Sequence, residues 1–380
     1  MKNNKIWYAP HQKEAYGDDE IKAVIDCLND GWLAGFGPRT IEFEEKVSTL
    51  FGKKYGLFVN SGSSAILLGL KALGFPEGSE VITPACTFAT TLAPILQCGL
   101  KPIFCEVEIG TYVPSPEQVF SKITKNTKII LLPNLIGSKP DWKEIRNMTL
   151  DMNIVLFEDS ADTITFTNET DVSITSFYSS HLITAGGSGG MVMFNNEKLL
   201  KQATMYRDWG RTGDNSEDVS QRFAHEVDGI LYDYKFLYGV VGYNMKSSEM
   251  NAAFGLVQLS RLAAIKDTRK RLFTRYLDNL KELDDVIILP INTFETDWLA
   301  IPFMTTDRMN LLTFLENNNI QTRVCFAGNI TRHPAYREYL EVFPVSDKIM
   351  SDGFLLGAHH GMTVDDVDYV CGKIKEFFGR

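Results

Sequence analysis

The sequence lacks several features that would point to particular compartments or partners. Its six cysteines contain no CxxC pair, so we expect reduced, buried thiols in a cytosolic protein. No apolar run approaches the ~20 residues that span a bilayer, and the N-terminal MKNNKIWYAPHQ lacks the apolar core of a signal peptide. Positive charge is scarce as well: the formal net charge of −10 at pH 7 argues against nucleic acids and anionic membranes as partners.

Lysine is missing from a long central stretch, with none between Lys143 and Lys198. This stretch contains residues 171–190, DVSITSFYSSHLITAGGSGG, where an alternating apolar run predicts a strand, followed by a polar turn and a glycine-rich segment. A second apolar run follows at 191–194. The pattern places one side chain, His181, on a tight loop between two strands, where a ligand can approach the backbone.

Before this hairpin, strand-like runs alternate with helical stretches. We expect strands at 55–60, 80–83, 101–107, 127–133 and 154–158, separated by helices at 63–74, 87–98, 116–123 and 141–150. Such alternation predicts a largely parallel sheet covered on both faces, with ligands at the carboxyl ends of its strands. An earlier helix, 18–30, carries an apolar stripe of Ile21, Val24, Ile25 and Leu28.

The remainder of the chain predicts a second domain. Two long helices are expected at about 246–263 and 265–283, and the second carries the chain into it. We therefore expect a large domain over residues 1–265 and a smaller α/β domain over residues 266–380. The smaller domain is expected to contain strands at 286–290 and 320–324 and helices near 307–318 and 363–378.

Several polar and aromatic residues follow the predicted strands, where chemistry is expected. Ser63 and Ser64 begin a helix, whose free N–H groups and two hydroxyls make a phosphate site, although a simple capped helix start has the same pattern. The Phe88 side chain is expected either to lie over the ring of a bound ligand or to pack in the core. Asp159 ends an apolar strand, and its carboxylate is costly to bury unless it faces a cation. Asp162 belongs either to the site or to a solvated helix.

The loop pattern resembles that of one family. Ser-Phe-x-x-x-Lys-x-x-x-x-Gly-x-x-Gly-Gly is the cofactor loop of the DegT-type pyridoxal-phosphate sugar aminotransferases, and His181 stands at the position of its cofactor-binding lysine. The resemblance implies an aspartate-aminotransferase-like α/β fold and pyridoxal 5′-phosphate or pyridoxamine 5′-phosphate as cofactor. It assigns the cofactor phosphate to Ser63, Ser64 and Ser176. It also places Phe88 against the ring and Asp159 at the pyridine nitrogen, which keeps the ring an electron sink.

Two further positions follow from the same resemblance. Asp162 falls where these aminotransferases usually carry glutamine near the cofactor. The segment 242–262, GYNMKSSEMNAAFGLVQLSRL, is similar to a family motif whose asparagine, here Asn244, reaches the phosphate in the neighbouring subunit. The resemblance therefore implies a homodimer with shared active sites.

The exchange at His181 changes the expected reaction. A lone loop histidine is more often structural than catalytic, but histidine exchanges protons near its pKa of about 6.5 and forms no stable imine. RDWGR (207–211) and YDYKF (232–236) also resemble the nucleotide-sugar 3-dehydratase branch, whose members carry histidine instead of lysine. This implies removal of the C3 hydroxyl from a nucleotide-linked 4-keto-6-deoxyhexose, with L-glutamate regenerating the pyridoxamine form, in deoxysugar and O-antigen biosynthesis.

The cysteines help to choose within this branch. The CDP-sugar type binds an iron–sulfur cluster through four cysteines, three of them downstream of the histidine, yet none lies between Cys105 and Cys325. The chain is therefore more similar to the type that acts on GDP-4-keto-6-deoxymannose. An aminotransferase, a dehydratase of another nucleotide sugar and a non-catalytic homologue stay open. Arg211, Arg332 and His333 are candidate diphosphate or sugar contacts, or plain surface residues.

Overall fold

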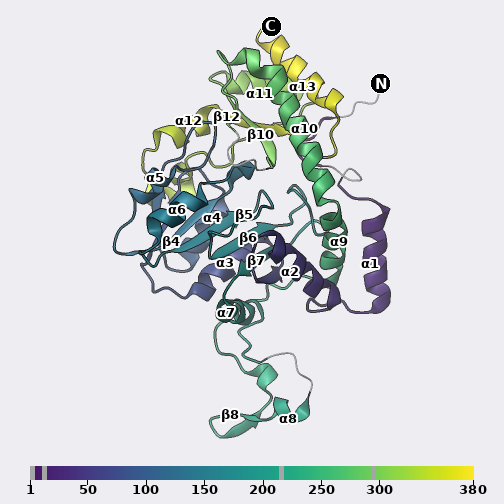
Figure 1. Ribbon diagram of the computed structural model, residues 1–380, viewed down its shortest axis with the longest axis vertical. Coiled ribbons are helices and arrows are strands. Elements are labelled where there is room, and N and C mark those ends of the chain that lie inside the picture. Colours follow the sequence, from purple (N-terminus) through teal and green to yellow (C-terminus); the bar gives the residue numbers. More distant parts are fainter. Residues whose placement is uncertain (1–4, 11–14, 214–217, 292–296) are drawn as a thin grey trace.

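The computed structural model describes residues 5–10, 15–213, 218–291 and 297–380. These residues form a large domain, a smaller C-terminal domain at the top of Figure 1 and an arm that projects at the bottom. The large domain is built on a seven-stranded sheet of order β1-β7-β6-β5-β4-β2-β3. Its strands are β1 (Tyr55–Val59), β2 (Glu80–Pro84), β3 (Lys101–Cys105), β4 (Thr127–Pro133), β5 (Val155–Ser160), β6 (Val172–Ser176) and β7 (Gly190–Phe194).

One strand of this sheet runs against the others. Strand β7 pairs antiparallel with β6 and β1, whereas the pairs among β2, β3, β4, β5 and β6 are parallel. The prediction of a largely parallel sheet is confirmed. The strands read as continuous apolar runs because both faces are covered, and Ile129, Ile130, Leu131 and Leu132 of β4 are fully buried.

Helices pack on both faces of the sheet. Alternation along β7 shows the division, because Val192 and Phe194 face α3 while Met191 and Met193 face α2 and α9. The helices of the first face are α3 (Gly62–Leu73), α4 (Ala89–Gln97) and α7 (Glu197–Arg207). Those of the second face are α2 (Pro38–Leu50), α5 (Pro116–Phe120), α6 (Trp142–Thr149) and α9 (Glu249–Ser260).

The smaller domain has an antiparallel sheet of order β10-β12-β11. Its strands are β10 (Ala300–Met304), β11 (Arg323–Val324) and β12 (Gly353–Gly357). Its helices are α10 (Leu262–Leu280), α11 (Arg308–Asn317), α12 (Pro344–Asp352) and α13 (Val364–Phe377). Helix α10 runs from the end of α9 into this domain (Figure 1), as the sequence predicts.

Two predictions for the smaller domain need correction. The strand expected at 286–290 is a single bridge between Ile288 and Met304, and the strand expected at 320–324 is shortened to β11. The N-terminal segment also contributes here, because Ile6 pairs with Ile320 and packs on the smaller domain. The residues of a short extended segment do not specify which strand it pairs with, because the tertiary fold determines that partner.

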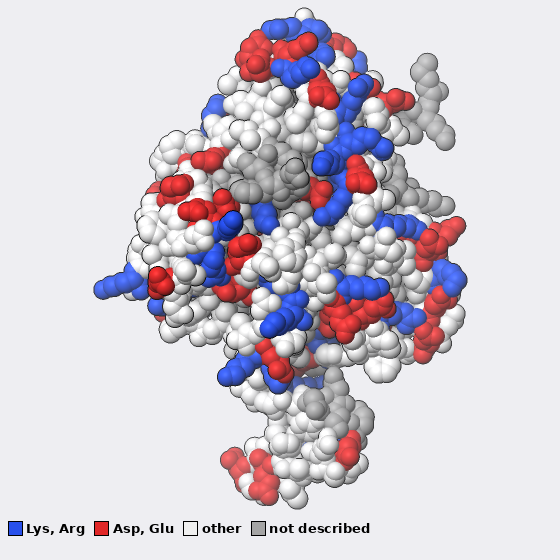
Figure 2. Space-filling view, viewed as in Figure 1, with Lys and Arg blue, Asp and Glu red and all other residues white. Residues whose placement is uncertain are grey.

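The arm consists of residues 211–213 and 218–241 and has no counterpart in the predicted elements. It contains α8 (Val219–Arg222) and an antiparallel hairpin of β8 (His225–Val227) and β9 (Ile230–Tyr232). Ile230 and Leu231 are 65% and 64% exposed. Figure 2 shows mostly uncharged atoms on the visible face of the arm, with acidic side chains at its end.

Helix α1 (Asp18–Asp30) presents a second exposed apolar surface. It packs on α9 and buries Glu20 and Cys27, whereas Ile21, Ile25 and Leu28 of the predicted stripe are half-exposed. Five of the six cysteines are buried free thiols and Cys98 is half-buried. In the described ranges, no helix combines the length and apolar character needed to cross a membrane.

Candidate active site

A cavity of about 520 Å³ opens at the carboxyl ends of β4, β5 and β6. The smaller domain closes it from the other side through residues of β11 and β12. This is the position at which parallel α/β sheets bind ligands. Six of the residues predicted for the site line it: Ser63, Phe88, Asp159, Asp162, Ser176 and His181.

One end of the cavity is the N-terminus of α3. Ser61 caps this helix, and its hydroxyl accepts a hydrogen bond from the Ser64 N–H (3.1 Å). Helix and strand approach closely here, because a Cβ at Gly62 would lie 2.8 Å from the Cβ of Ser176. The first-turn N–H groups and the side chains of Ser63 and Ser176 therefore meet in one corner, which suits a phosphate group.

The buried carboxylate of Asp159 lies at the end of β5. Its Oδ2 accepts a hydrogen bond from Thr91 Oγ1 (2.7 Å), and its Oδ1 accepts one from the Ala161 N–H (3.2 Å). Burial raises the pKa of Asp159 to about 6, against these two hydrogen bonds. A cationic group placed against the carboxylate would lower this pKa again, so the position favours a protonated ligand nitrogen.

Aromatic rings bound the same cavity. Phe88 caps α4 and is 53% exposed. Its ring meets that of Phe326 edge to face, with centroids 6.0 Å apart. A half-exposed phenylalanine on the cavity wall is not buried in the core, so Phe88 is available to pack against a planar ligand ring.

The loop between β6 and β7 carries His181 and is held by its own hydrogen bonds. The His181 N–H donates to the Tyr178 carbonyl (3.0 Å), and Thr184 Oγ1 donates to the Phe177 carbonyl (3.0 Å). Three of the glycines that follow have positive φ, which lets the chain turn back into β7. The loop therefore fixes the backbone of His181 next to the cavity.

His181 faces Asp162, and burial acts on the two in opposite directions. Asp162 Oδ1 is 3.9 Å from His181 Nε2, while Oδ2 accepts a hydrogen bond from the Ile136 N–H (2.8 Å). Burial raises the pKa of Asp162 to about 7 and lowers the pKa of His181 to about 4. His181 is thus neutral near pH 7, and within the described residues its Nδ1 has no hydrogen-bond partner. A neutral imidazole on a cavity wall can accept a proton.

Three predicted residues lie elsewhere in the fold. The hydroxyl of Ser64 donates to Asn60 Oδ1 (2.7 Å) within the turn and does not line the cavity. Asn244 and Arg211 lie near the base of the arm. The backbone of Asn244 forms a β-bridge with Asp208, and the guanidinium of Arg211 lies 4.6 Å from the ring centre of Trp209. Roles for Asn244 and Arg211 stay predictions that involve a second subunit or the substrate.

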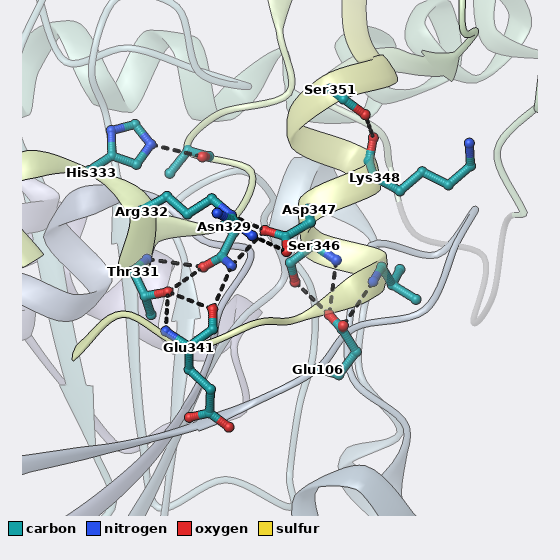
Figure 3. Close-up of polar contacts among 12 residues, drawn as sticks. Glu106, Asn329, Thr331, Arg332, His333, Glu341, Ser346, Asp347, Lys348 and Ser351 are labelled. Carbon is teal, nitrogen blue, oxygen red and sulfur yellow. Dashed lines mark hydrogen bonds and ion pairs between the residues drawn. The ribbon is translucent and has the colours of Figure 1, made fainter. Parts of the chain in front are cut away.

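Arg332 and His333 are also away from the cavity wall. Figure 3 shows Arg332 directed at Asp347, where Nη2 lies 2.6 Å from Oδ2, and His333 Nε2 lies 2.9 Å from the Ala327 carbonyl. Within this chain, both side chains hold the segment that joins β11 to α12, and a contact of either with the substrate stays a prediction. Sequence spacing does not reveal an acidic partner fifteen residues downstream.

Arg323 and Tyr8 line the cavity but belong to no recognised sequence motif, so they were not predicted for the site. Arg323 of β11 lines it with its guanidinium 5.6 Å from the ring centre of Tyr8, another lining residue. Burial raises the pKa of Tyr8 above its ordinary value. Both residues belong to segments of the smaller domain that reach the large domain only in the tertiary fold, although the alternation around Arg323 was visible in the sequence.

The site fits pyridoxal 5′-phosphate. The α3 N-terminus suits its phosphate, Phe88 suits its ring face, and the buried Asp159 suits a protonated pyridine nitrogen. The fold and site thus define a pyridoxal-phosphate-dependent α/β enzyme. The family follows from comparison with known proteins: the model of the DegT/DnrJ/EryC1/StrS aminotransferase family matches residues 14–375, and the chain belongs to this family.

Relatives in this family modify nucleotide sugars by more than one reaction. The chain is 33% identical to lipopolysaccharide biosynthesis protein RfbH of Salmonella typhimurium (97% of this chain, 92% of the relative). It is also 33% identical to dTDP-4-dehydro-2,6-dideoxy-D-glucose 3-dehydratase of Saccharopolyspora spinosa (96% and 85%) and 29% identical to GDP-perosamine synthase of Vibrio cholerae (97% and 99%).

A solved structure shares the fold over almost the whole chain. It is E. coli GDP-4-keto-6-deoxy-D-mannose-3-dehydratase with bound hydrated pyridoxal phosphate, with a TM-score of 0.86 at 26% identity, covering 98% of this chain and all of the other. The aspartate-aminotransferase-like fold and the pyridoxal or pyridoxamine phosphate cofactor expected from the sequence are confirmed. The protein is a pyridoxal-phosphate-dependent, sugar-modifying enzyme.

Proposed function

We propose that this protein is a nucleotide-sugar 3-dehydratase that removes the C3 hydroxyl of a nucleotide-linked 4-keto-6-deoxyhexose, with GDP-4-keto-6-deoxymannose as the first candidate substrate. The observation that carries this proposal is His181 on the cavity wall. Among the described lining residues there is no lysine that could hold the cofactor covalently. Histidine exchanges protons but forms no stable imine, so proton transfer is the chemistry left to this position.

The residues of the chain divide the work. Ser63, Ser176 and the α3 N-terminus hold the cofactor phosphate, and Asp159 holds the protonated ring nitrogen. When bound, the cofactor supplies an amine for the sugar ketone and a ring that takes up an electron pair. His181 is neutral near pH 7, so a nitrogen of its imidazole can accept a proton. The imidazole then returns the proton to the C3 hydroxyl oxygen, which leaves as water. Asp162 faces the resulting imidazolium.

Arg323 is the residue we assign to the carboxylate of L-glutamate, which regenerates the amine form. Its guanidinium lies on the cavity wall beside Tyr8, and arginine pairs well with carboxylates because of its planar fork of donors. Replacing Arg323 by lysine keeps the charge and removes the fork. We therefore expect a raised KM for glutamate with little change for the sugar substrate.

We also propose a homodimer with shared active sites. Two surfaces support it: the apolar arm and the outward stripe of α1, because patches of this kind on one chain mark contact with another. Asn244, near the base of the arm, would then reach the cofactor phosphate of the neighbouring subunit. The proposed reaction has no iron–sulfur cluster and takes place in the cytoplasm, as part of deoxysugar and O-antigen biosynthesis.

The test combines substrate choice with stoichiometry. The enzyme is incubated with glutamate and a panel of GDP-, CDP-, dTDP- and UDP-linked 4-keto-6-deoxy sugars. We expect one 2-oxoglutarate and one ammonia per 3-deoxy product, without iron, NADH or a reductase, because the nitrogen that enters with the amine is released by hydrolysis. Turnover that needs a reductase, or that consumes no glutamate, contradicts this mechanism.

An aminotransferase is the second candidate, and the GDP-perosamine synthase relative favours it. Such an enzyme would leave the amine on the sugar, so mass spectrometry of the product separates the two. Borohydride reduction of the pyridoxal-loaded protein gives a second criterion, because a displaced lysine would be trapped as a pyridoxyl adduct. A non-catalytic homologue would show no cofactor absorbance after loading.

A further inference from the structure

Segment 297–299 lies between helix α10 and the turn that follows β4. One face of helix α10 holds all three of its residues. Lys266 Nζ lies 2.7 Å from the carboxylate of Asp297. The ring of Phe273 stacks on Trp298 at a centroid distance of 5.3 Å and an interplanar angle of 9°, and Arg269 Nη1 donates to the Leu299 carbonyl (2.7 Å). The i, i+3, i+7 spacing of the helix places these three side chains on one face.

The same segment is docked on a turn of the large domain. The Leu299 N–H donates to the Ile136 carbonyl (2.7 Å), in the turn Leu135–Gly137 that follows β4. Ile136 has φ +60 and Gly137 has φ +100, so both occupy the left-handed region. A Cβ on Gly137 would lie 2.2 Å from the Asp297 carbonyl oxygen, which leaves room for glycine alone. Strain of this kind persists only where surrounding contacts hold it.

The other side of the turn reaches the site. The Ile136 N–H donates to Asp162 Oδ2 (2.8 Å), and the second oxygen of that carboxylate faces His181 Nε2 at 3.9 Å. Arg269, Leu299, Ile136, Asp162 and His181 thus form one continuous path of contacts from α10 to the catalytic loop. Asp162 is the member whose carboxylate would swing freely without the turn, because Ile136 N–H is the hydrogen-bond donor that fixes it.

We propose that segment 297–299 and the Ile136–Gly137 turn form a positioning relay by which helix α10 and the C-terminal domain set the orientation of Asp162 opposite His181. The relay deepens the proposed function, since it rests on His181 acting as the base. Docking of the C-terminal domain would then also fix the orientation of Asp162 that proton transfer at His181 needs. Neither Gly137 nor Lys266 touches the cavity, so both are positioning residues.

The environment of the pair sets what a measurement will see. The titratable and charged groups around His181 and Asp162 are Asp159, Tyr8, Tyr178, Arg269, Arg323 and Cys325. Burial lowers the pKa of Arg269 to about 10, so its guanidinium is still charged at pH 7. A displaced Asp162 changes the field at the imidazole, so the ring resonance of His181 reports directly on the relay.

The experiment uses carbon-13-labelled histidine in the cofactor-free full chain, which has six histidines. The His181 resonance is assigned by its loss in His181→Asn. We expect Gly137→Ala to shift this resonance at pH 7 and to change its titration midpoint. Gly78→Ala is the matched control, because Gly78 has φ +80 but nothing within 4 Å of the added methyl group. An unchanged His181 resonance in folded Gly137→Ala, or an equal shift in the control, overturns the relay.

A second pair of variants keeps the test decisive if Gly137→Ala does not fold. Asp297→Asn removes the ion pair with Lys266 but leaves the hydrogen bond of Lys266 Nζ to the Ile164 carbonyl (2.6 Å), whereas Asp267→Asn removes the same charge from an exposed position of α10. We expect the His181 shift in Asp297→Asn only. In the holoenzyme, the relay variants should slow the glutamate half-reaction up to about 100-fold, the cost of a misplacement near 1 Å, at unchanged glutamate affinity. If His181→Asn keeps full turnover, the proposed function fails while the resonance data still judge the relay.

Discussion

The wall of the cavity and the arm use the same chain in opposite ways. On the wall, two buried carboxylates are each held by a donor: Asp159 by the Thr91 hydroxyl and Asp162 by the Ile136 N–H. On the arm, apolar side chains such as Ile230 and Leu231 are exposed. Burying a polar group without a partner is costly, and so is exposing a large apolar patch. The buried carboxylates of the wall therefore have their hydrogen-bond donors within this chain, whereas the apolar side chains of the arm stay exposed on it.

The largest effect on the cavity wall is expected for Asp159→Asn. The substitution keeps the shape and removes the charge that pairs with the ring nitrogen. We expect the glutamate half-reaction, followed by cofactor absorbance, to slow by about 100- to 1,000-fold, the range for loss of one preorganised electrostatic contact. Asp352→Asn, at another buried aspartate far from the cavity, is the control. A near-normal rate in Asp159→Asn would remove Asp159 from the cofactor site.

On the arm side, the change is a double substitution of Ile230 and Leu231 by aspartate. If the arm docks on a second copy, two charges are placed in an apolar contact, and we expect the dimer dissociation constant to rise by about 100-fold or more. Sedimentation velocity measures it, with Leu150→Asp, a 71% exposed site on the body, as control. Identical sedimentation of the double variant and the wild type would show that the arm has another partner or none.

A smaller effect is expected in the pH dependence of stability. In the folded protein the pKa of Asp162 is raised by burial to about 7, above its unfolded value of 3.8. The folded state therefore binds the proton of Asp162 more tightly than the unfolded state does. The contribution of Asp162 to stability is fully present below pH 3.8 and is lost as pH rises through 7. We expect Asp162→Asn to stabilise the cofactor-free protein by about 2 kcal/mol more at pH 8 than at pH 5, in urea unfolding. The arm variants should show no such pH dependence, and a pH-independent gain in Asp162→Asn would contradict the raised pKa.

Much of the site could be predicted because its residues belong to short motifs. The strand–loop–strand pattern around His181 and the strand end at Asp159 are local, so the sequence places both at the carboxyl edge of a parallel sheet. Ser63 was predicted for the same reason. The pattern did not separate Ser63 from Ser64, because the direction of each hydroxyl depends on the cap that Ser61 makes.

Arg332 shows the limit of the same reasoning. Its charge suggested a contact with the substrate, whereas within this chain its guanidinium pairs with Asp347. The packing of the segment between β11 and α12 places these two side chains together. Tyr8 and the stripe on α1 follow the same rule. Which neighbour a side chain meets depends on long-range packing, and an extended or amphipathic segment is compatible with several neighbours.

The sequence alone was enough to predict the sheet and to show histidine where the family motif has lysine, because periodicity and local motifs act over a few residues. The tertiary structure was needed to bring Arg323 and Tyr8 to the cavity, to pair Arg332 with Asp347, and to connect α10 with Asp162 through Leu299 and Ile136. The contacts of Arg323 with Tyr8 and of Leu299 with Ile136 join residues more than a hundred positions apart, and their geometry exists only once both domains have folded against each other.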